Sequence, residues 1–373
     1  MLRNRKLVAL IIVAVLIVGS IAFLQSRKAA VNVNAISDNA EIIIPELSES
    51  EKAKRYDRAR EITDPAGFIN SEPFQLRDVI GKKVILLDIW TYSCINCQRT
   101  LPYITSWDEK YRDEGLLVVG IHSPEFEFEK KQENVMAAVE QFGIKYPVVL
   151  DNDFGTWHAY RNSYWPRKYL IDIDGYVVYD RIGEGGYAET ERKIQELLAE
   201  RAQKLNESVT YQQEITNVFV PEAITDTMPR SPETYFGAWR NATFGNGSPG
   251  VQGGMNLKEP KTIADNMFYL VGSWNIHREY AENATRDGRL LYRYTGDKVF
   301  MVASSEHGGT IRIMQDGKPI GEAAGADVDA SGRVRIQAEG LYKLIDNPDG
   351  AGKHELEIVF EDPGIHIFTF TFG

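Results

Sequence analysis

The two cysteines of this chain lie three residues apart, at the junction between a predicted strand and a predicted helix. The segment 84–90 is almost continuously apolar, as expected of a central strand that is buried on both faces. Cys94-Ile95-Asn96-Cys97 follows it, and the next residues have helical apolar spacing. Two thiols on a first helical turn close a disulfide with little backbone movement, and the helix start stabilises a thiolate. The arrangement is the sequence form of a dithiol redox site.

The segments after this motif alternate between strand and helix patterns. This order predicts an α/β domain over residues 61–204, with a central mixed sheet and helices on both faces. Asp174-Gly175 is a hairpin turn signal between its last two strands. The predicted strands are 84–90, 116–122, 147–150, 168–173 and 176–181, and the predicted helices are 97–112, 127–142, 154–162 and 188–204.

The last third of the chain has a different pattern. Residues 205–230 read as a linker, and 231–373 contain short alternating runs separated by Gly, Asn and Asp turns. No long helix is predicted there. Many short strands with this spacing favour an all-β sandwich or jelly roll.

The N-terminus has the pattern of a membrane segment. Residues 7–24 are apolar apart from Gly19 and Ser20, and basic residues precede them. Eighteen residues are close to the lower limit for a bilayer span. Because no good cleavage site directly follows Leu24, we expect residues 1–24 to form an uncleaved single-pass anchor rather than a cleaved signal peptide. Residues 25–60 then form a tether, and the rest of the chain lies outside the cytoplasm.

Charge and cysteine content exclude two classes of protein. A net charge of −11 argues against nucleic acid as a partner, because phosphate binding needs a basic face. Two cysteines are too few for a disulfide scaffold, so their pairing is expected to be functional.

Helix geometry predicts different roles for the two thiols. Cys94 is expected to be the more exposed sulfur and to attack a substrate disulfide, whereas Cys97, one turn deeper, resolves the mixed disulfide. Asp88 precedes Cys94 by six residues on the buried strand. Burial raises the pKa of a carboxyl group, so Asp88 is a candidate acceptor for the proton that Cys97 must lose. The alternative for Asp88 is a satisfied buried carboxylate.

Four further residues are candidates for substrate binding. Trp165 and Pro166 precede the predicted strand 168–173, and a cis bond between them would present backbone to an extended substrate beside the sulfurs. Packing is an equal alternative for Trp165. Tyr92 and Asn96 flank or separate the cysteines and are weaker candidates for tuning the thiolate.

The competing interpretation of the two cysteines is a structural disulfide or half of a zinc site. A four-ligand zinc site needs two more ligands, and the six histidines lack His-x-x-x-His spacing. We therefore predict no metal site and no cofactor. Four aromatic residues of the last domain could stack on sugar rings, although core packing is the favoured role: Trp239, Trp274, Tyr280 and Tyr292.

Residues 61–204 resemble the thioredoxin superfamily, in the extracytoplasmic branch that includes the TlpA, ResA and DipZ groups. The similarity is carried by 88–103, by 121–126 and by 164–166, and it is strongest toward DipZ-type proteins. The resemblance implies that Asp88 is the buried family acid, Trp90 the strand-end tryptophan and Pro166 the cis-proline. It also implies a carbohydrate-binding-module-like domain at 231–373.

DipZ-type proteins also carry a CcdA-like electron-transfer domain with several spans. Because one span is predicted here, the resemblance implies a separate electron donor, a membrane protein of CcdA or DsbD type. The leading hypothesis is therefore a membrane-anchored thiol-disulfide oxidoreductase that reduces protein disulfides. The alternative is a surface module that binds glycan or protein, with the thioredoxin-like part as scaffold.

Overall fold

The computed structural model describes residues 47–211, 213–220 and 230–373. The predicted anchor 1–24 lies outside these residues, as does most of the predicted tether 25–60. None of the helices in the described ranges combines the length and the apolarity that crossing a bilayer requires.

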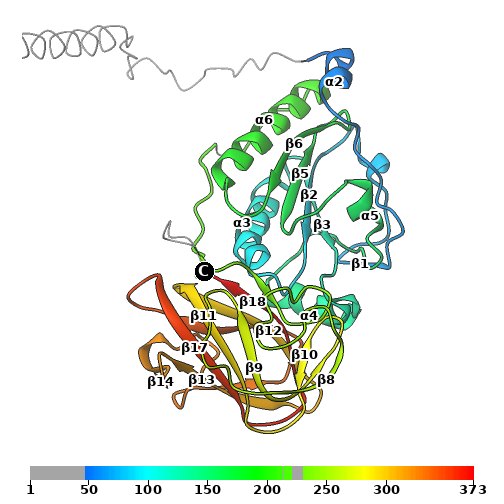
Figure 1. The fold of residues 1–373 in the computed structure, drawn as a ribbon. Coiled ribbons are helices and arrows are strands. Elements are labelled where there is room, and N and C mark those ends of the chain that lie inside the picture. The colour runs from blue at the N-terminus through cyan, green and yellow to red at the C-terminus, as the bar shows by residue number, and fades with distance from the viewer. Residues whose placement is uncertain (1–46, 212, 221–229) are drawn as a thin grey trace, which may run out of the picture. The chain divides into compact units, whose positions relative to one another are not determined.

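The first domain is built on a six-stranded mixed sheet in the order β1-β4-β3-β2-β5-β6 (Figure 1). Strands β2, β3 and β4 are parallel, and the remaining neighbours pair antiparallel. All seven residues of β2 are buried, because neighbouring strands and helices cover both of its edges and faces. The strands are β1 (Gly67–Ile69), β2 (Val84–Trp90), β3 (Leu116–His122), β4 (Val148–Leu150), β5 (Arg167–Ile171) and β6 (Val177–Ile182).

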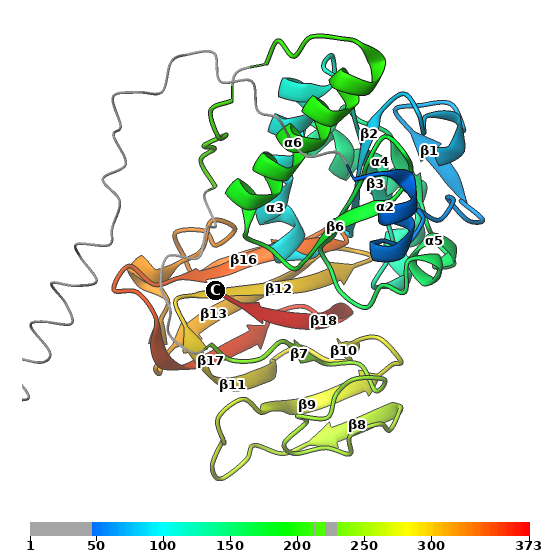
Figure 2. The ribbon, with the colours of Figure 1, turned by 90° about the horizontal axis from the view of Figure 1, so that it is seen from above.

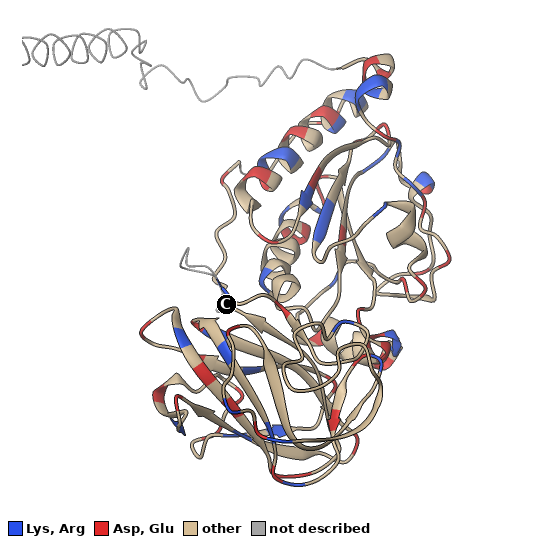
Figure 3. Cartoon of the chain, in the orientation of Figure 1, with Lys and Arg blue, Asp and Glu red and all other residues tan. Residues whose placement is uncertain are grey.

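Helices cover both faces of this sheet, as predicted. Apolar residues of α3, α4 and α6 share one core with alternate residues of β2, and the intervening β2 residues pack on the other face with α5. Acidic and basic residues are interspersed along α6 (Figure 3). The helices are α2 (Glu49–Arg55), α3 (Ile95–Tyr111), α4 (Gln132–Gln141), α5 (Gly155–Ala159) and α6 (Tyr187–Leu205), with 3₁₀ turns η2 (Leu76–Asp78) and η3 (Glu127–Lys130).

The C-terminal domain is all-β, as predicted, and its strands form one curled twelve-stranded sheet (Figure 2). β9 pairs with β11 through its first half and with β8 and β10 through its second, and Gly272, with φ +97°, lies between the halves. The strands are β7 (Thr234–Tyr235), β8 (Gly253–Leu257), β9 (Phe268–Ile276), β10 (Ala281–Asn283), β11 (Gly288–Gly296), β12 (Lys298–Ser305), β13 (Gly309–Gln315), β14 (Lys318–Pro319), β15 (Arg333–Ile336), β16 (Gly340–Asp346), β17 (Gly352–Phe360) and β18 (Ile365–Phe372), with one 3₁₀ turn, η4 (Gly321–Ala323).

The curling of this sheet places the inward-facing side chains of its strands in one core. Trp274 and Tyr292 belong to that core and are fully buried, which agrees with the favoured packing role for both. The all-β prediction is confirmed, but the expected two separate sheets are not found. β9 is hydrogen-bonded to β11 through its first half and to β8 through its second, so the two groups of strands form one continuous sheet.

One predicted helix is divided in two. The segment 127–142 contains η3 and α4, separated at Lys131, whose backbone is extended. The break follows from the inward-turned Glu129 carboxylate, which accepts hydrogen bonds from the backbone at Glu125 and Phe126 and so closes a separate short turn.

Candidate active site

Cys94 is the N-cap residue of α3, directly after the loop that leaves β2. Its backbone is extended, its carbonyl accepts the N–H of Gln98 at 3.0 Å, and its side chain is half-buried. The first turn of α3 contains no acidic residue. A thiol at this position meets the positive end of the helix dipole and is accessible, which suits a nucleophile.

Cys97 lies one turn further along α3, and its side chain is 1% exposed. Both cysteines are free thiols in this structure. Burial raises the pKa of the Cys97 thiol well above its ordinary value, and hydrogen bonding to Cys94 and the charge of Asp88 raise it further. Cys97 is therefore protonated at neutral pH and needs a base before it can act as a nucleophile.

Asp88 lies behind the cysteines in the middle of β2 and is 1% exposed. Neither of its carboxylate oxygens accepts a hydrogen bond from a described residue. Burial raises the pKa of Asp88 to about 6, and the positive charge of Lys168 partly opposes that rise. A carboxyl group that titrates near neutrality suits proton transfer, because both of its protonation states are populated at working pH.

Lys168 is a residue of this site that sequence reasoning missed. It is fully buried on β5, directly opposite Asp88 in the antiparallel pairing with β2. Its ammonium donates to the carbonyl of Gly183 at 3.0 Å. Burial lowers the pKa of Lys168, and the charges of Asp88 and Cys97 oppose this. The only sequence signal was a lysine at the start of the predicted strand 168–173.

The other cross-strand neighbour of Asp88 is Gly120 on β3. A Cβ at Gly120 would lie 2.9 Å from Nε1 of Trp90 and 3.2 Å from the ring of Tyr146. The Trp90 Nε1 and the Tyr146 hydroxyl are buried and, like the Asp88 carboxylate, lack a hydrogen-bond partner among the described residues. Burial, and then the charge of Asp88, raise the pKa of Tyr146. The missing side chain at Gly120 thus lets Trp90 and Tyr146 pack closely against β3, next to the cross-strand partner Asp88.

The Trp165–Pro166 peptide is cis, as the sequence predicted. Arg167 pairs with Ile89, so Pro166 lies beside the end of β2 from which the chain continues to Cys94. Trp165 is half-buried, its ring lies 4.3 Å from that of Trp157, and its Nε1 donates to the carbonyl of Ser123 at 2.9 Å. Trp165 therefore packs against Trp157 and still leaves part of its ring exposed at the surface.

Tyr92 and Asn96 are both occupied by partners within the chain. Tyr92 is 7% exposed, and its hydroxyl donates to the carbonyl of Glu339 in the C-terminal domain at 3.3 Å. The Asn96 side-chain oxygen accepts from the Arg99 guanidinium at 2.8 Å. Arg99 also pairs with Glu184 at 2.9 Å. The geometry thus gives Tyr92 an interdomain contact.

Glu129 is a second residue that the sequence did not single out. It is fully buried on η3 and accepts from the backbone N–H and the hydroxyl of Ser93, at 3.2 and 2.7 Å. Its other oxygen accepts from the N–H groups of Glu125 and Phe126, at 2.6 and 3.0 Å. Burial raises the pKa of Glu129, and these hydrogen bonds oppose the rise. Glu129 fixes the residue directly before Cys94.

His122 received no predicted role and is fully buried at the end of β3. Its ring lies edge-on to Trp90 at 5.1 Å and stacks on Tyr92 at 5.7 Å. Burial lowers the pKa of His122 to about 3. The imidazole is therefore neutral at physiological pH and extends the aromatic packing under the Cys94 loop.

The C-terminal domain packs directly beside this loop. Phe126 and Phe128 lie 5.0 and 4.9 Å from the ring of Phe368 on β18. The Glu125 carboxylate accepts from Arg240 at 2.7 Å and from the Tyr235 hydroxyl at 2.9 Å. The turn that contains Glu129 is thus held from both sides, by Ser93 and by the second domain.

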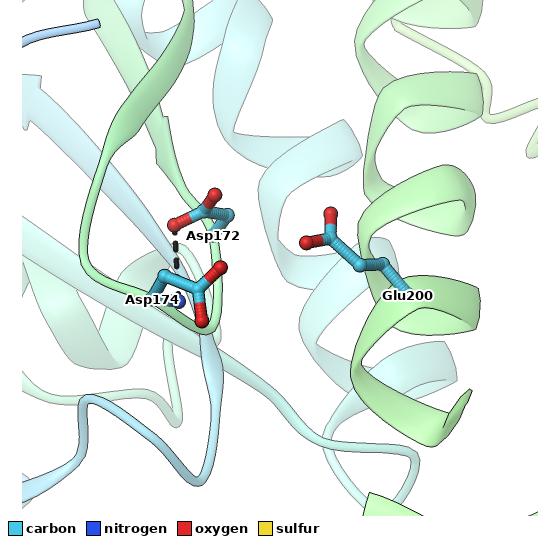
Figure 4. A group of neighbouring side chains, drawn as sticks. All are labelled: Asp172, Asp174 and Glu200. Atoms are coloured by element: carbon cyan, nitrogen blue, oxygen red, sulfur yellow. Dashed lines mark hydrogen bonds between the residues drawn. The ribbon is translucent and has the colours of Figure 1, made fainter. Parts of the chain in front are cut away.

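Three carboxylates elsewhere in the domain lie close enough to suggest a cation site: Asp172, Asp174 and Glu200 (Figure 4). The ammonium of Lys52 on α2 lies at their centre and donates to all three, at 2.6 Å for each aspartate. Lys52 is 3% exposed. The cluster therefore binds the protein's own lysine and docks α2 on the sheet.

Comparisons with known proteins match both domains. Residues 56–198 match the Redoxin family, and residues 231–373 match the family described as Thioredoxin like C-terminal domain. Protein DipZ of Mycobacterium bovis is 34% identical over 312 residues, which cover 82% of this chain and 41% of that protein. The chain thus spans less than half the length of this relative.

Two shorter relatives match the first domain. The thiol-disulfide oxidoreductase YkuV of Bacillus subtilis is 28% identical over 38% of this chain and 93% of that protein. The thiol-disulfide oxidoreductase ResA of Bacillus thuringiensis is 30% identical over 31% of this chain and 64% of that protein. The chain therefore contains a redoxin domain followed by a thioredoxin-like C-terminal domain, and its homologues include DipZ, YkuV and ResA of the TlpA, ResA and DipZ group.

Proposed function

We propose that the protein is a dithiol reductase of protein disulfides, with Cys94 as nucleophile and Cys97 as resolving thiol. The observation that carries the proposal is the contrast between the two sulfurs. Cys94 is accessible at a helix start, whereas Cys97 is 1% exposed and lies close to the buried Asp88 carboxylate. This is the arrangement that sequential thiol exchange requires, because one sulfur must reach the substrate and the other must not.

The reaction transfers two electrons from the enzyme dithiol to the substrate disulfide in two exchange steps. The Cys94 thiolate attacks one sulfur of a substrate disulfide, forms a mixed disulfide and releases the other sulfur as a thiolate, which takes up a proton. Cys97 loses its proton to Asp88 and attacks the Cys94 sulfur, which expels the second substrate sulfur as a thiolate; this thiolate takes up a proton, and Asp88 returns its own proton to solvent. The substrate gains two electrons and the enzyme becomes the Cys94–Cys97 disulfide. A dithiol donor must then reduce it.

Protein substrates, the reducing direction and a separate membrane donor of CcdA or DsbD type all belong to this proposal. Support for them comes from the similarity to DipZ, ResA and YkuV. The apolar segment 7–24 with its basic flank supports a single-pass anchor with both domains outside the cytoplasm. Labelling of the cysteines in intact cells with a membrane-impermeant maleimide tests that location, and protection from the reagent would contradict it.

Insulin reduction and mixed-disulfide trapping test the chemistry. The reduced full chain should catalyse insulin reduction with dithiothreitol as donor, and both Cys94→Ser and Cys97→Ser should abolish turnover. Only Cys97→Ser should accumulate a covalent adduct with a disulfide substrate, because its attacking thiol remains. An adduct that forms in Cys94→Ser but not in Cys97→Ser would reverse the two roles. Full turnover by Cys94→Ser would exclude the mechanism.

A glycan-binding role for the C-terminal domain is the second candidate function. It receives less support, because Trp274 and Tyr292 are buried in the core. Tyr280 stacks between His277 and His366, at 4.4 and 4.3 Å. Trp239, which is 61% exposed, is the one of the four proposed aromatic residues with a largely open ring.

A further inference from the structure

A cleft of about 400 Å³ lies between the two domains, on the side of the active site that carries the cis-proline. The first domain contributes Trp165, directly before Pro166, together with Phe126 and Phe154. The C-terminal domain contributes Trp239 and Arg278, with Arg240 and Glu279 at the same wall. The cleft therefore exists only where both domains are present.

Trp239 is held at this cleft by backbone structure. Its N–H donates to the carbonyl of Arg278 at 2.9 Å, and the N–H of Ala238 donates to that of His277 at 2.9 Å. Gly237 permits this approach, since a Cβ there would lie 2.1 Å from the Glu279 backbone. The ring is nevertheless 61% exposed. An exposed tryptophan on a fixed backbone adds nothing to the core, and such residues are common as binding hot spots.

Arg278 provides a positive charge that the described part of the chain does not neutralise. Its guanidinium lies 4.6 Å from the centre of the Trp239 ring, and no described carboxylate pairs with it. The neighbouring Arg240 differs, because it pairs with Glu125 at 2.7 Å. Arg278 is thus positioned to bind an acidic group that arrives from outside, next to an aromatic surface.

We propose that this Trp239–Arg278 cleft binds a segment of the substrate polypeptide that flanks the cysteine under attack. The segment it fits is extended and carries an aromatic or apolar side chain next to an acidic one. The aromatic side chain packs against Trp239 and Trp165, and the acidic one pairs with Arg278. This inference rests on the proposed function, and it gives the C-terminal domain a part in selecting substrates.

A polypeptide suits the cleft better than a glycan. A protein substrate has to reach the cis-proline side of the active site, on which this cleft lies, whereas a glycan does not. The cleft also includes Trp165, whose chain continues directly into Pro166 beside the end of β2. A substrate that enters this cleft therefore continues toward the backbone next to the thiols.

Equilibrium binding of a cysteine-free peptide tests the inference without any thiol chemistry. The probe is a short fluorescein-labelled peptide that contains Glu and Phe, and its partner has the same length with Lys and Ser at those positions. By fluorescence anisotropy, the full chain should bind the Glu-Phe peptide about tenfold more tightly than the Lys-Ser peptide. Trp239→Ala should weaken Glu-Phe binding about tenfold, and Arg278→Gln should remove the preference for Glu.

Phe219→Ala is the matched control, because Phe219 is an exposed aromatic residue of the linker outside the cleft. It should bind both peptides like the wild type. Equal affinity of the wild type for the two peptides would overturn the inference, as would unchanged binding by Trp239→Ala. Oligosaccharide binding that depends on Trp239, with no peptide binding, would overturn it in favour of a glycan site.

A second measurement separates this inference from the proposed function. Each variant is reacted with a small uncharged aliphatic disulfide, bis(2-hydroxyethyl) disulfide, and with a mixed disulfide of a Glu-Phe peptide to which one cysteine has been added. Trp239→Ala should react with the small disulfide like the wild type but show about a tenfold higher KM for the peptide disulfide. A wild type that binds the peptide yet reduces neither disulfide would exclude the reductase function and leave the binding site established.

Discussion

Asp88 on β2 and Lys168 on β5 are direct cross-strand partners, and both side chains are buried behind Cys97. No ion pair links them in the described structure, although their charges act on each other. The pair places one acid and one base in the apolar interior under the resolving thiol. We therefore expect the protonation of this pair to influence both the reactivity and the stability of the domain.

Asp88→Asn should stabilise the protein at neutral pH and slow its catalysis. The folded-state pKa of Asp88, about 6, lies above the ordinary value of 3.8, so the folded state binds the proton more tightly than the unfolded state. Wild-type stability therefore falls as the pH rises from about 4 to 6 and stays lower above that range. The variant should be more stable at pH 7 by about 2–3 kcal/mol.

Urea denaturation of the reduced proteins at several pH values measures this difference. The gain should be small at pH 4, where wild-type Asp88 is protonated in the folded state and partly protonated in the unfolded state. Insulin reduction by Asp88→Asn should lose the inflection near pH 6. A stability gain that is the same at pH 4 and pH 7 would show that burial of the charge is not its cause.

Lys168→Met should shift the pH dependence of catalysis upward. Lys168 lowers the pKa of Asp88, so removal of its charge should raise that pKa above 6 and move the inflection of the insulin-reduction profile to higher pH. The double variant with Asp88→Asn is the control, since no titrating carboxyl remains. If the double variant shows the same upward shift, Lys168 acts through another group.

The sequence predicted the fold of the first domain closely because its signals are local. Val84–Trp90 is apolar apart from Asp88, and the cysteines, the Asp174-Gly175 turn and Pro166 each have a short-range signature. Lys168 had none, because its importance depends on which strand pairs with β2 and in which register. Nothing near Asp88 in the sequence contains that long-range information.

Dependence on long-range contacts also explains the other residues and strands that the sequence did not reveal. Glu129 looked like one of several acidic residues on a continuous helix, whereas its role depends on Ser93, thirty-six positions earlier. Strands β8, β10 and β16 have little local strand signal, because β8 begins with two glycines, β10 has three residues and β16 is mostly half-exposed. Their strand structure comes from neighbours in the sheet rather than from local propensity.

Glu129→Ala should destabilise the domain and impair catalysis together. It removes the acceptor of four hydrogen bonds and leaves the buried donors of Ser93 and Phe126 and the half-buried donor of Glu125 unpaired, at a cost of about 2–4 kcal/mol. Glu129→Gln keeps one side-chain oxygen that can accept hydrogen bonds, so it should lose less stability and less activity than Glu129→Ala. Urea denaturation measures the first effect, and kcat/KM for insulin measures the second.

Ser93→Ala is the control for this position. It removes only the hydroxyl bond to Glu129 and should cost about 1 kcal/mol. Unchanged kcat/KM in a folded Glu129 variant would restrict Glu129 to a structural role, because Ser93 directly precedes the attacking thiol.

Lys52→Met should release α2 from the sheet and destabilise the first domain. Burial alone would lower the pKa of Lys52, but its hydrogen bonds to Asp172, Asp174 and Glu200 raise the pKa well above its ordinary value. Without the ammonium, three carboxylates remain close together with Lys204 as the nearby cation. Breaking a buried ion-pair group of this kind costs about 3–5 kcal/mol.

Lys54→Met is the matched control, because Lys54 lies on the same helix but is exposed. It should change the free energy of unfolding by less than about 0.5 kcal/mol. Urea denaturation compares the two variants, and limited proteolysis should cut Lys52→Met faster near residue 55 than either the control or the wild type. Calcium should partly restore the stability of Lys52→Met but not affect the wild type, since only the variant leaves the three carboxylates without their central cation. Equal stability of the two lysine variants would show that α2 is not held by this cluster.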